Sequence, residues 1–386
     1  MHILLITSRY LPHRGGLEMV VSHLAARLIQ NGHHVVIGTN RYPHFLPAVE
    51  MIDDIEVRRF SFIEPEWSAV KNNRMDLFAA GLFYKYVSTW QMERWMLEFH
   101  PDVVNLHYLE SPASFLYRTW QKHTFPLVVS LHGGDVDGEP GQSQAKMDRF
   151  LRVSNAANAV TACSQSLASQ AEKLNPALIG KIQVIYNAVD SDRFAAAKPW
   201  NLNYPYILSV GQLSEHKGFD LLIHGFSMIA KKYPDVNLVI SGDGNQRGIL
   251  ERMAITEDVK ERVVFTGKIS EDAVASLMKG CLFLAVPSRR EPFGMVALEG
   301  MAAGKMVLAT KVGGIPEFLP VPLNSYVLPD ESSWRDALDN ALRVIKKGKF
   351  AGTENQITAS RFSWQKLTQN YLKVYENAIF DFKKEH

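Results

Sequence analysis

The stretch PSRREPFGMVALEGMAAGK (residues 287–305) has the pattern of a loop that joins a buried strand to a helix. An apolar run, CLFLAVP (281–287), precedes it and predicts the strand, and the helix is expected to begin at Gly294 and to run to Ala303. MVLAT (306–310) predicts the next strand. Strands that alternate with helices form mostly parallel sheets, so this stretch predicts an α/β fold.

The same alternation continues in both directions along the chain. Further strands are predicted at residues 2–7, 34–39, 102–107, 126–132, 159–164, 182–187, 206–211, 236–242 and 262–267. The segment AAAKPWNLNYPY (195–206) interrupts this alternation with two prolines and several turn formers. We therefore expect two Rossmann-like domains, with a ligand cleft between the carboxyl ends of their sheets. The expected parts are residues 1–195, a linker at 196–205, residues 206–363, and a C-terminal helix at 364–386.

Composition and charge exclude several classes of protein. Of the 386 residues, 46% are hydrophobic and 21% are charged, which excludes a disordered chain, a collagen-like fibre and a coiled coil. The 42 basic and 40 acidic residues nearly balance, so no nucleic-acid partner is expected. Cys163 and Cys281 are too few for a disulfide framework. The apolar runs are too short for a membrane span, and the first residues predict a strand rather than a signal peptide, so a cytoplasmic location is expected.

The predicted helix start in the opening stretch is a candidate anion site. Backbone N–H groups of Gly294, Met295 and Val296 precede the intrahelical hydrogen bonds and can bind a phosphate. Glu291 and Glu299 flank this helix start, and their carboxylates would accept hydrogen bonds from sugar hydroxyls. A nucleotide sugar fits this combination. The alternative is that Glu291 is a helix-start charge and Glu299 a solvated residue.

Three other loops follow predicted strands and contain residues suited to a ligand site. In SVGQLSEHKGF (209–219) the strand ends at Gly211, and Lys217 can neutralise a phosphate. In RYLPHRGGLE (9–18) the backbone at Gly16 can receive an anion or form a tight turn. In SLHGGDVDG (130–138) His132 has either a structural role or a role in the cleft.

These strings together resemble the retaining GT-B glycosyltransferases of family four, over nearly the whole chain. The most specific part is the E-x7-E motif, which Glu291 and Glu299 form within EPFGMVALE. The resemblance implies two Rossmann-like domains facing across a cleft. The C-terminal helix, in which Trp364, Leu367 and Tyr371 recur at helical spacing, is expected to pack back on the first domain.

The resemblance also implies a role for each motif residue. Glu299 would hold the ribose hydroxyls, and Glu291 would contact the donor hexose. Lys217 would bind the diphosphate together with the amides of Gly294 and Met295, and His132 would contact the donor sugar near the reaction centre. The implied catalytic residues are thus His132, Glu291 and Lys217, and the implied donor-binding residues are Gly16, Gly211, Gln212, Lys217, Gly242, Gly294, Met295, Val296 and Glu299.

The implied reaction moves a hexose from a nucleoside diphosphate sugar to a hydroxyl of a saccharide or lipid-linked acceptor, with retention of configuration. Its setting would be cell-surface polysaccharide or glycolipid assembly. A UDP sugar is slightly preferred over GDP-mannose on the frequency of donors in the family. No metal cofactor is expected, because Lys217 and the helix start can stabilise the leaving diphosphate. The single Asp-x-Asp triplet, DVD (135–137), is weak evidence for a metal site.

Gln212 is a departure from the family pattern. The family usually has VGRL where this chain has VGQL, so a cation that binds the diphosphate is lost. Either Lys217 and the helix start suffice, or Arg289 or Arg290 compensates for the missing charge.

Other functions stay open at this point. Gln212 is compatible with a non-catalytic nucleotide-sugar-binding protein, and a nucleotide-sugar epimerase on the same fold is a further alternative. GDGNQRG (242–248) resembles a dinucleotide-binding loop, but no acidic residue follows at a second strand end, which disfavours a nicotinamide-dependent oxidoreductase.

The segment from Trp67 to Trp95 combines aromatic and basic residues and is a candidate membrane contact. Its members are Trp67, Phe78, Phe83, Tyr84, Trp90 and Trp95 with Lys71, Arg74, Lys85 and Arg94. Such a segment can rest on an anionic membrane surface or hold a lipid-linked sugar. Peripheral contact with the inner face of the membrane is therefore one expectation, and a core helix with a solvated basic face is the other.

Overall fold

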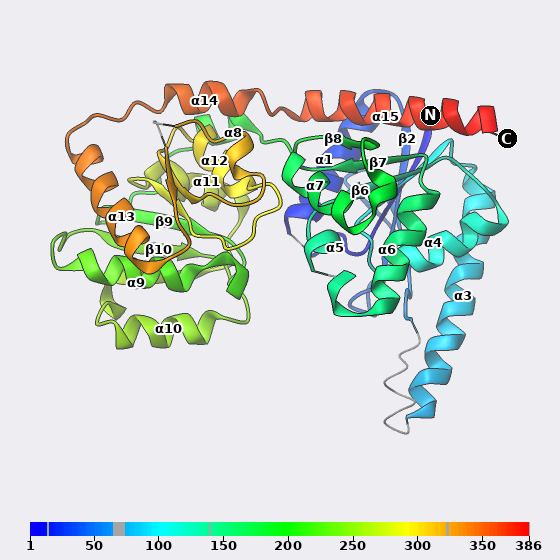
Figure 1. The fold of residues 1–386 in the computed structure, drawn as a ribbon, viewed down its shortest axis with the longest axis horizontal. Coiled ribbons are helices and arrows are strands. Elements are labelled where there is room, and N and C mark those ends of the chain that lie inside the picture. Colours follow the sequence, from blue (N-terminus) through cyan, green and yellow to red (C-terminus); the bar gives the residue numbers. More distant parts are fainter. Residues whose placement is uncertain (14, 65–73, 139, 322–323, 386) are drawn as a thin grey trace. The chain divides into compact units, whose positions relative to one another are not determined.

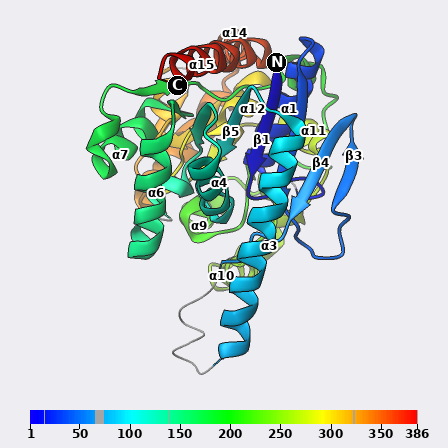
Figure 2. The same cartoon turned by 90° about the vertical axis from the view of Figure 1, so that its right-hand side faces the viewer.

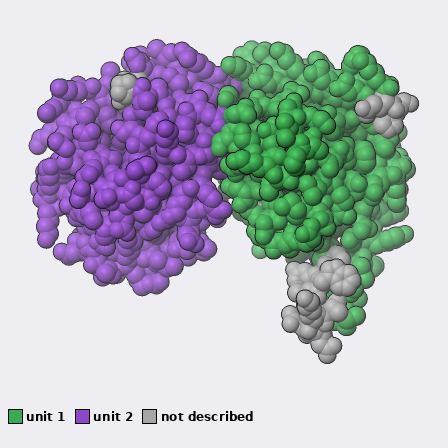
Figure 3. Space-filling view, viewed as in Figure 1, with its two compact units in different colours: residues 1–186, 364–386 green, residues 187–363 purple. Residues whose placement is uncertain are grey.

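The computed structural model describes residues 1–386 except 14, 65–73, 139, 322–323 and 386. The chain forms two compact units (Figure 3): unit 1 contains residues 1–186 and 364–386, and unit 2 contains residues 187–363. None of the described helices is both long and apolar enough to cross a membrane.

The division between the units differs from the expected domains, because residues 187–195 and the expected linker 196–205 belong to unit 2. Helix α8 (Ser191–Ala196) lies in this segment. Phe194 is buried, and Arg193 pairs with Glu271 at 2.6 Å. These contacts attach the segment to unit 2 instead of leaving it as a linker.

Unit 1 contains, in its described residues, an eight-stranded sheet in the order β3-β4-β2-β1-β5-β6-β7-β8. The strands are β1 (His2–Thr7), β2 (His34–Asn40), β3 (Val49–Ile52), β4 (Ile55–Phe60), β5 (Val103–His107), β6 (Leu127–Leu131), β7 (Ala159–Ala162) and β8 (Ile182–Val184). β3 and β4 pair antiparallel at one edge (Figure 2), and the other neighbours run parallel. β5 and β6 are buried along their whole length, as is usual for strands of a parallel sheet covered on both faces.

The helices of unit 1 include the C-terminal one (Figure 1). They are α1 (Gly16–Gln30), α3 (Met75–Phe99), α4 (Ser111–Lys122), α5 (Gly134–Asp137), α6 (Gln144–Ala156), α7 (Gln165–Leu174) and α15 (Trp364–Glu385). The Trp364 ring stacks on His23 of α1 with centroids 4.4 Å apart. The Tyr375 hydroxyl accepts a hydrogen bond from Asn105 of β5 at 2.8 Å. These contacts confirm that the C-terminal helix packs on the first domain.

Unit 2 contains, within its described residues, a six-stranded parallel sheet in the order β11-β10-β9-β12-β13-β14. The strands are β9 (Tyr206–Val210), β10 (Asn237–Ser241), β11 (Val263–Gly267), β12 (Leu284–Val286), β13 (Val307–Thr310) and β14 (Ser325–Val327). Besides α8, the helices are α9 (Phe219–Ala230), α10 (Arg247–Thr256), α11 (Glu271–Gly280), α12 (Met295–Ala302), α13 (Glu331–Lys346) and α14 (Thr353–Ser360). Two α/β units with mostly parallel sheets confirm the predicted architecture.

Each sheet has a point at which the strand order reverses. In unit 1 it lies between β1 and β5, and in unit 2 it lies between β9 and β12. Loops that leave two such neighbouring strands run in opposite directions and open a crevice at the carboxyl ends, where ligands bind in open α/β sheets. The loops after β9 and β12 therefore define the candidate site in unit 2, and they carry Lys217 and Glu291.

Candidate functional site

Lys217 and Glu291 meet at the reversal point of the unit 2 sheet. Lys217 ends the short 3-10 helix η3 (Glu215–Lys217) after β9, and Glu291 lies in the loop after β12. The Lys217 Nζ atom lies 2.6 Å from Glu291 Oε2, and their side chains are 22% and 12% exposed. Ser288 Oγ donates to the same carboxylate oxygen at 3.0 Å. The structure thus brings together two predicted site residues that are 74 positions apart.

The two loops that carry this ion pair are also joined through their backbones. The Arg289 and Arg290 N–H groups donate to the His216 carbonyl at 2.7 and 3.3 Å. Gly218 has a φ of +67°, and a Cβ there would overlap the Pro287 carbonyl oxygen. Glycine is needed for both reasons. The backbone therefore holds Lys217 beside the loop of Glu291.

The start of α12 lies beside Glu291. Gly294 adopts a φ of +110°, and a Cβ built on it would be 3.6 Å from Glu291 Cγ. The first intrahelical hydrogen bond runs from the Leu298 N–H to the Gly294 carbonyl. The N–H groups of Gly294, Met295 and Val296 are therefore not used by the helix and are suited to an anion.

Gly313 and Gly314 support Glu291 from the loop after β13, and no site role was predicted for them. The Gly314 N–H donates to the Glu291 carbonyl at 3.2 Å. A Cβ on Gly313 would overlap the same carbonyl oxygen. The motif GGIPE (313–317) was the available signal for this loop.

Glu299 lies on α12, and the charged groups that act on it come from α8 and α11. Burial, the largest cause, and the nearby Glu271 raise the pKa of Glu299, Arg193 lowers it, and the net result is a pKa of about 7. Arg193 is held by Glu271 at 2.6 Å and by Asp272 at 2.7 Å. Glu299 is therefore a carboxyl group that changes its charge near neutral pH.

Gly211 and Gly242 lie at the ends of the neighbouring strands β9 and β10. A Cβ on Gly242 would overlap the Gly211 carbonyl oxygen, and the two glycines have φ values of +156° and +142°. Gln212 follows and is exposed. Glycine is needed at position 242 because the backbones of the two strand ends lie close together there.

Two arginines were candidates to replace the cation missing at Gln212. Arg289 donates two hydrogen bonds to the Asp220 carboxylate, at 2.7 and 2.6 Å, which together hold its guanidinium group on Asp220. Arg290 is exposed and makes no ion pair with a described residue. Of the two, Arg290 is the one available to a ligand.

In unit 1, His132 directly follows β6. Its Nε2 atom lies 3.0 Å from Nδ1 of His107, and burial lowers the pKa of His132 to about 4. The Asp135 carboxylate accepts hydrogen bonds from the N–H groups of His132 and Gly133, at 3.1 and 2.8 Å. Gly16 begins α1, and nothing lies within 4 Å of a Cβ built there.

The structure also bears on the triplet DVD (135–137), which was the weak candidate for a metal site. Asp135 is buried and accepts backbone N–H groups, while Asp137 is exposed. Among the described residues, no three His, Cys, Asp or Glu side chains are grouped as metal ligands would be.

Comparisons with known families identify the class of protein. Residues 190–359 match the family described as Glycosyl transferases group 1, and residues 14–193 match Glycosyltransferase Family 4. With two parallel-sheet units and GT-B structural neighbours, the chain belongs to the GT-B glycosyltransferases of family 4. These matches confirm the glycosyltransferase family and the GT-B fold that the resemblance implied.

Individual relatives cover nearly the whole chain. The chain is 26% identical to the gpi3 subunit of phosphatidylinositol N-acetylglucosaminyltransferase from Schizosaccharomyces pombe, over 97% of this chain and 80% of that protein. Sucrose-phosphate synthase from Thermosynechococcus elongatus has a similar structure, with a TM-score of 0.80, 19% identity, and coverage of 97% of this chain and 98% of that one. HepE of Anabaena in complex with UDP-glucose gives a TM-score of 0.76 at 20% identity, over 97% and 99% of the two chains.

Proposed function

We propose that this glycosyltransferase moves a hexose from a nucleoside diphosphate sugar to a hydroxyl of a saccharide or lipid-linked acceptor, with retention of configuration. The observation that carries the proposal is the Lys217–Glu291 pair beside the start of α12. A cation and unused N–H groups suit a diphosphate, and a carboxylate beside them suits sugar hydroxyls. The complex of HepE with UDP-glucose supports a UDP sugar as the first donor to test.

The proposal assigns each donor group to residues of the site. Lys217 and the amides of Gly294 and Met295 bind the diphosphate, Glu291 contacts the hexose, and Glu299 accepts the ribose hydroxyls. The Val296 amide belongs to the same anion site, Gln212 stands where the family has a diphosphate-binding cation, and Gly211 and Gly242 line the nucleotide pocket. In unit 1, His132 contacts the sugar, and Gly16 contacts the diphosphate or the acceptor.

In the proposed reaction the acceptor hydroxyl attacks the anomeric carbon from the face that the diphosphate leaves. The bond between the anomeric carbon and the phosphate oxygen breaks as the new glycosidic bond forms, and the leaving phosphate takes the hydroxyl proton. Lys217 and the start of α12 stabilise the negative charge that develops on the diphosphate. In this proposal they take the role that a metal ion would otherwise have.

A donor screen tests the proposal. The protein is incubated with UDP-glucose, UDP-galactose, UDP-N-acetylglucosamine, ADP-glucose and GDP-mannose, and nucleotide release and binding are measured for each. We expect release from at least one UDP sugar. Tight binding without release in the presence of candidate saccharide and lipid acceptors would favour the non-catalytic alternative, and an interconverted donor sugar would favour the epimerase.

The pKa of Glu299 predicts that donor binding weakens in mild acid. The ionised carboxylate accepts hydrogen bonds from two ribose hydroxyls, so donor binding requires a deprotonated Glu299. The affinity for the donor therefore reaches its full value above the pKa of about 7. At pH 6 roughly one carboxyl in ten is ionised, so the donor KM should approach a tenfold increase over its value at pH 8. Glu299→Gln should raise KM and remove this dependence. A donor KM that is equal at pH 6 and pH 8 would contradict the assignment.

Gln212→Arg is expected to keep or raise donor affinity. A charge-assisted hydrogen bond to a phosphate is stronger than one from a neutral amide. Gln212 is exposed and Arg289 is held by Asp220, so an arginine has space at this position. Calorimetric titration with UDP measures the effect, with Gln212→Leu as the variant that removes the amide without adding charge. A large loss of affinity in the arginine variant would show that Gln212 has a role of its own.

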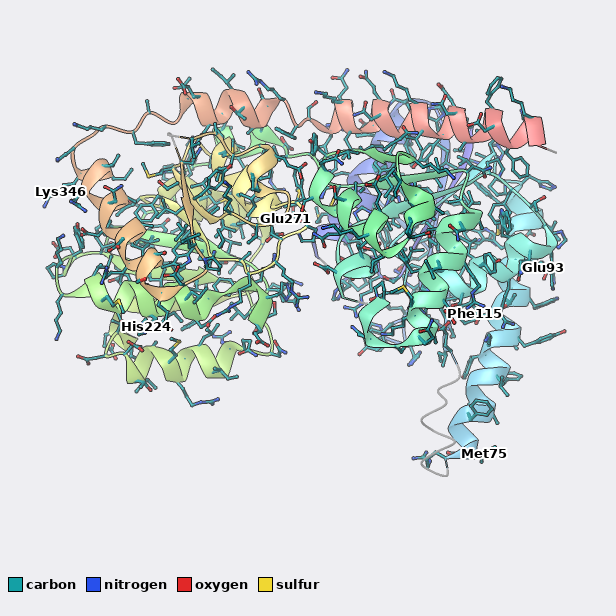
Figure 4. All side chains as sticks on the ribbon, viewed as in Figure 1. Met75, Glu93, Phe115, His224, Glu271 and Lys346 are labelled. Atoms are coloured by element: carbon teal, nitrogen blue, oxygen red, sulfur yellow. The ribbon has the colours of Figure 1, made fainter. Side chains whose placement is uncertain are left out.

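Helix α3 is the proposed site of contact with an anionic membrane and its lipid-linked acceptor. It extends beyond the rest of unit 1, with Met75 near its far end (Figures 1 and 4). One exposed stripe recurs at helical spacing and consists of Phe83, Tyr86, Trp90, Arg94 and Leu97. Lys85 supplies a further cation, and its pKa is lowered by burial and by the nearby Arg118 and Arg152.

The opposite face of α3 packs on unit 1, which corrects part of the expected membrane segment. Trp95 is 3% exposed and contacts Phe60 and Arg58, so it belongs to the core. Trp67 and Lys71 lie outside the described residues. The proposed contact is therefore the exposed stripe of α3 rather than all the aromatic residues of the segment.

We expect the protein to float with vesicles that contain phosphatidylglycerol at low salt. The double variant Phe83→Asp/Trp90→Asp should lose this binding, because it places two charges on the apolar stripe. Ile255→Asp is the matched control, since Ile255 is 57% exposed on α10. Absence of vesicle binding by the unmodified protein at low salt would remove α3 as a membrane contact.

A further inference from the structure

His107 and His132 form a pair of rings at the carboxyl ends of β5 and β6. His107 is the last residue of β5, and its side chain is completely buried. Its Nδ1 atom lies 3.0 Å from Nε2 of His132, and the stacked rings have centroids 5.2 Å apart. The other ring nitrogen of His107, Nε2, is buried and has no hydrogen-bond partner in the described part of the chain.

Both rings are neutral at physiological pH. Burial lowers the pKa of His132 to about 4, and burial together with His132 holds the pKa of His107 well below its usual value. A hydrogen bond between two neutral imidazoles contains one hydrogen, so one ring donates and the other accepts. Which ring donates decides the tautomer of His132.

The unpartnered Nε2 atom of His107 decides between the two arrangements. If His132 donated, the hydrogen of His107 would be on Nε2, as a buried N–H with no acceptor. If His107 donates from Nδ1, its Nε2 is a bare acceptor. Buried N–H groups without a partner are rarer in native structures than acceptors that are not fully used. The second arrangement is therefore favoured.

We propose that His107 is a positioning residue, whose Nδ1–H donates to Nε2 of His132 and fixes His132 as the tautomer with its hydrogen on Nδ1. That hydrogen is then the donor that the His132 ring offers to a hydroxyl of the bound sugar, a role that rests on the proposed function. The backbone of His132 is held separately by Asp135, at 3.1 Å. His107 thus fixes the tautomer of the His132 ring, while Asp135 accepts a hydrogen bond from the main-chain N–H of His132.

Tyr371 of α15 provides a matched control in the same environment. Its ring centroid lies 5.9 Å from that of His107, but its hydroxyl bonds to Ser130 and Thr161. Tyr371→Phe therefore removes a buried hydrogen-bonding group near the pair without removing a partner of either histidine. A change in stability alone should follow.

Nitrogen-15 NMR of the histidine rings tests the proposal on the full chain at pH 7.5, without ligand. In the unmodified protein His132 should carry its hydrogen on Nδ1, which long-range proton–nitrogen correlations report directly. His107→Asn should keep this tautomer, because the asparagine Nδ2 can donate from nearly the same place. His107→Leu and Tyr371→Phe should differ: the first should change the tautomer, and the second should not.

Donor turnover provides the second readout. His107→Leu should lower kcat by about tenfold with a smaller change in KM, by analogy with partners that orient metal-binding histidines, and His107→Asn should restore most of it. Hydrogen on Nε2 of His132 in the unmodified protein would overturn the proposal, as would an unchanged tautomer in a folded His107→Leu variant. The expected tautomers with unchanged turnover would confirm the positioning and contradict instead the sugar contact of His132.

Discussion

Lys217→Ala is expected to lower kcat/KM for the donor by roughly 2–5 kcal/mol of transition-state stabilisation, or about 30-fold to several thousand-fold. Lys217 is the cation at the reversal point of the unit 2 sheet, and its positive charge would stabilise the negative charge that develops on the leaving diphosphate. Steady-state kinetics with the donor found in the screen measures the loss. Wild-type kinetics in this variant would contradict the assignment of the diphosphate site.

The ion pair with Glu291 complicates this variant, because alanine removes the cation from a carboxylate that is 12% exposed. The double variant Lys217→Ala/Glu291→Gln separates the loss of the diphosphate cation from the effect of an unpaired carboxylate. It removes the charge of Glu291 together with the lysine that binds the diphosphate. We expect the double variant to regain stability but not activity. Lys232→Ala is the surface control, because Lys232 pairs with Asp339 at 2.6 Å on the same unit and is exposed. It should leave kinetics unchanged.

Gly313→Ala is expected to destabilise unit 2 and to weaken donor binding. The φ of +55° costs alanine roughly 1–2 kcal/mol. A Cβ would also overlap the Glu291 carbonyl oxygen, and relief of such crowding typically costs about 1–3 kcal/mol more. The free energy of unfolding should therefore fall by roughly 2–5 kcal/mol, as urea titration measures. The donor KM should rise because the loop of Glu291 has to move.

Gly348→Ala is the matched control for this prediction. Gly348 has a φ of +62°, and nothing lies within 4 Å of a Cβ built there. This variant should show the conformational cost alone, with unchanged donor KM. Equal losses of stability in the two variants would show that contact with the Glu291 loop contributes nothing at Gly313.

The fold could be predicted well because its signals are local. Runs such as residues 3–7 and 103–107 are buried along their length in the structure, so they stand out in the sequence as short apolar segments between polar ones. Lys217 and Glu291 could be placed because both follow such runs at strand ends. The domain boundary was harder to predict from the sequence, because it depends on a contact between Arg193 and Glu271, which are 78 positions apart.

The parts of the site that the sequence did not reveal depend on contacts between distant segments. Gly313 lies beside Glu291 only because β13 neighbours β12. His107 meets His132 because β5 and β6 are adjacent, and a single histidine at a strand end gives no sign of its partner. For α3, composition alone did not separate Trp95, which is buried, from Trp90, which is 53% exposed.

The stereochemistry of transfer tests the central claim most directly. Proton NMR follows the anomeric hydrogen of the sugar first released or transferred from an α-linked nucleoside diphosphate sugar, before mutarotation mixes the anomers. Attack on the face that the diphosphate leaves predicts that the first product is the α anomer. A β anomer as the first product would contradict the account.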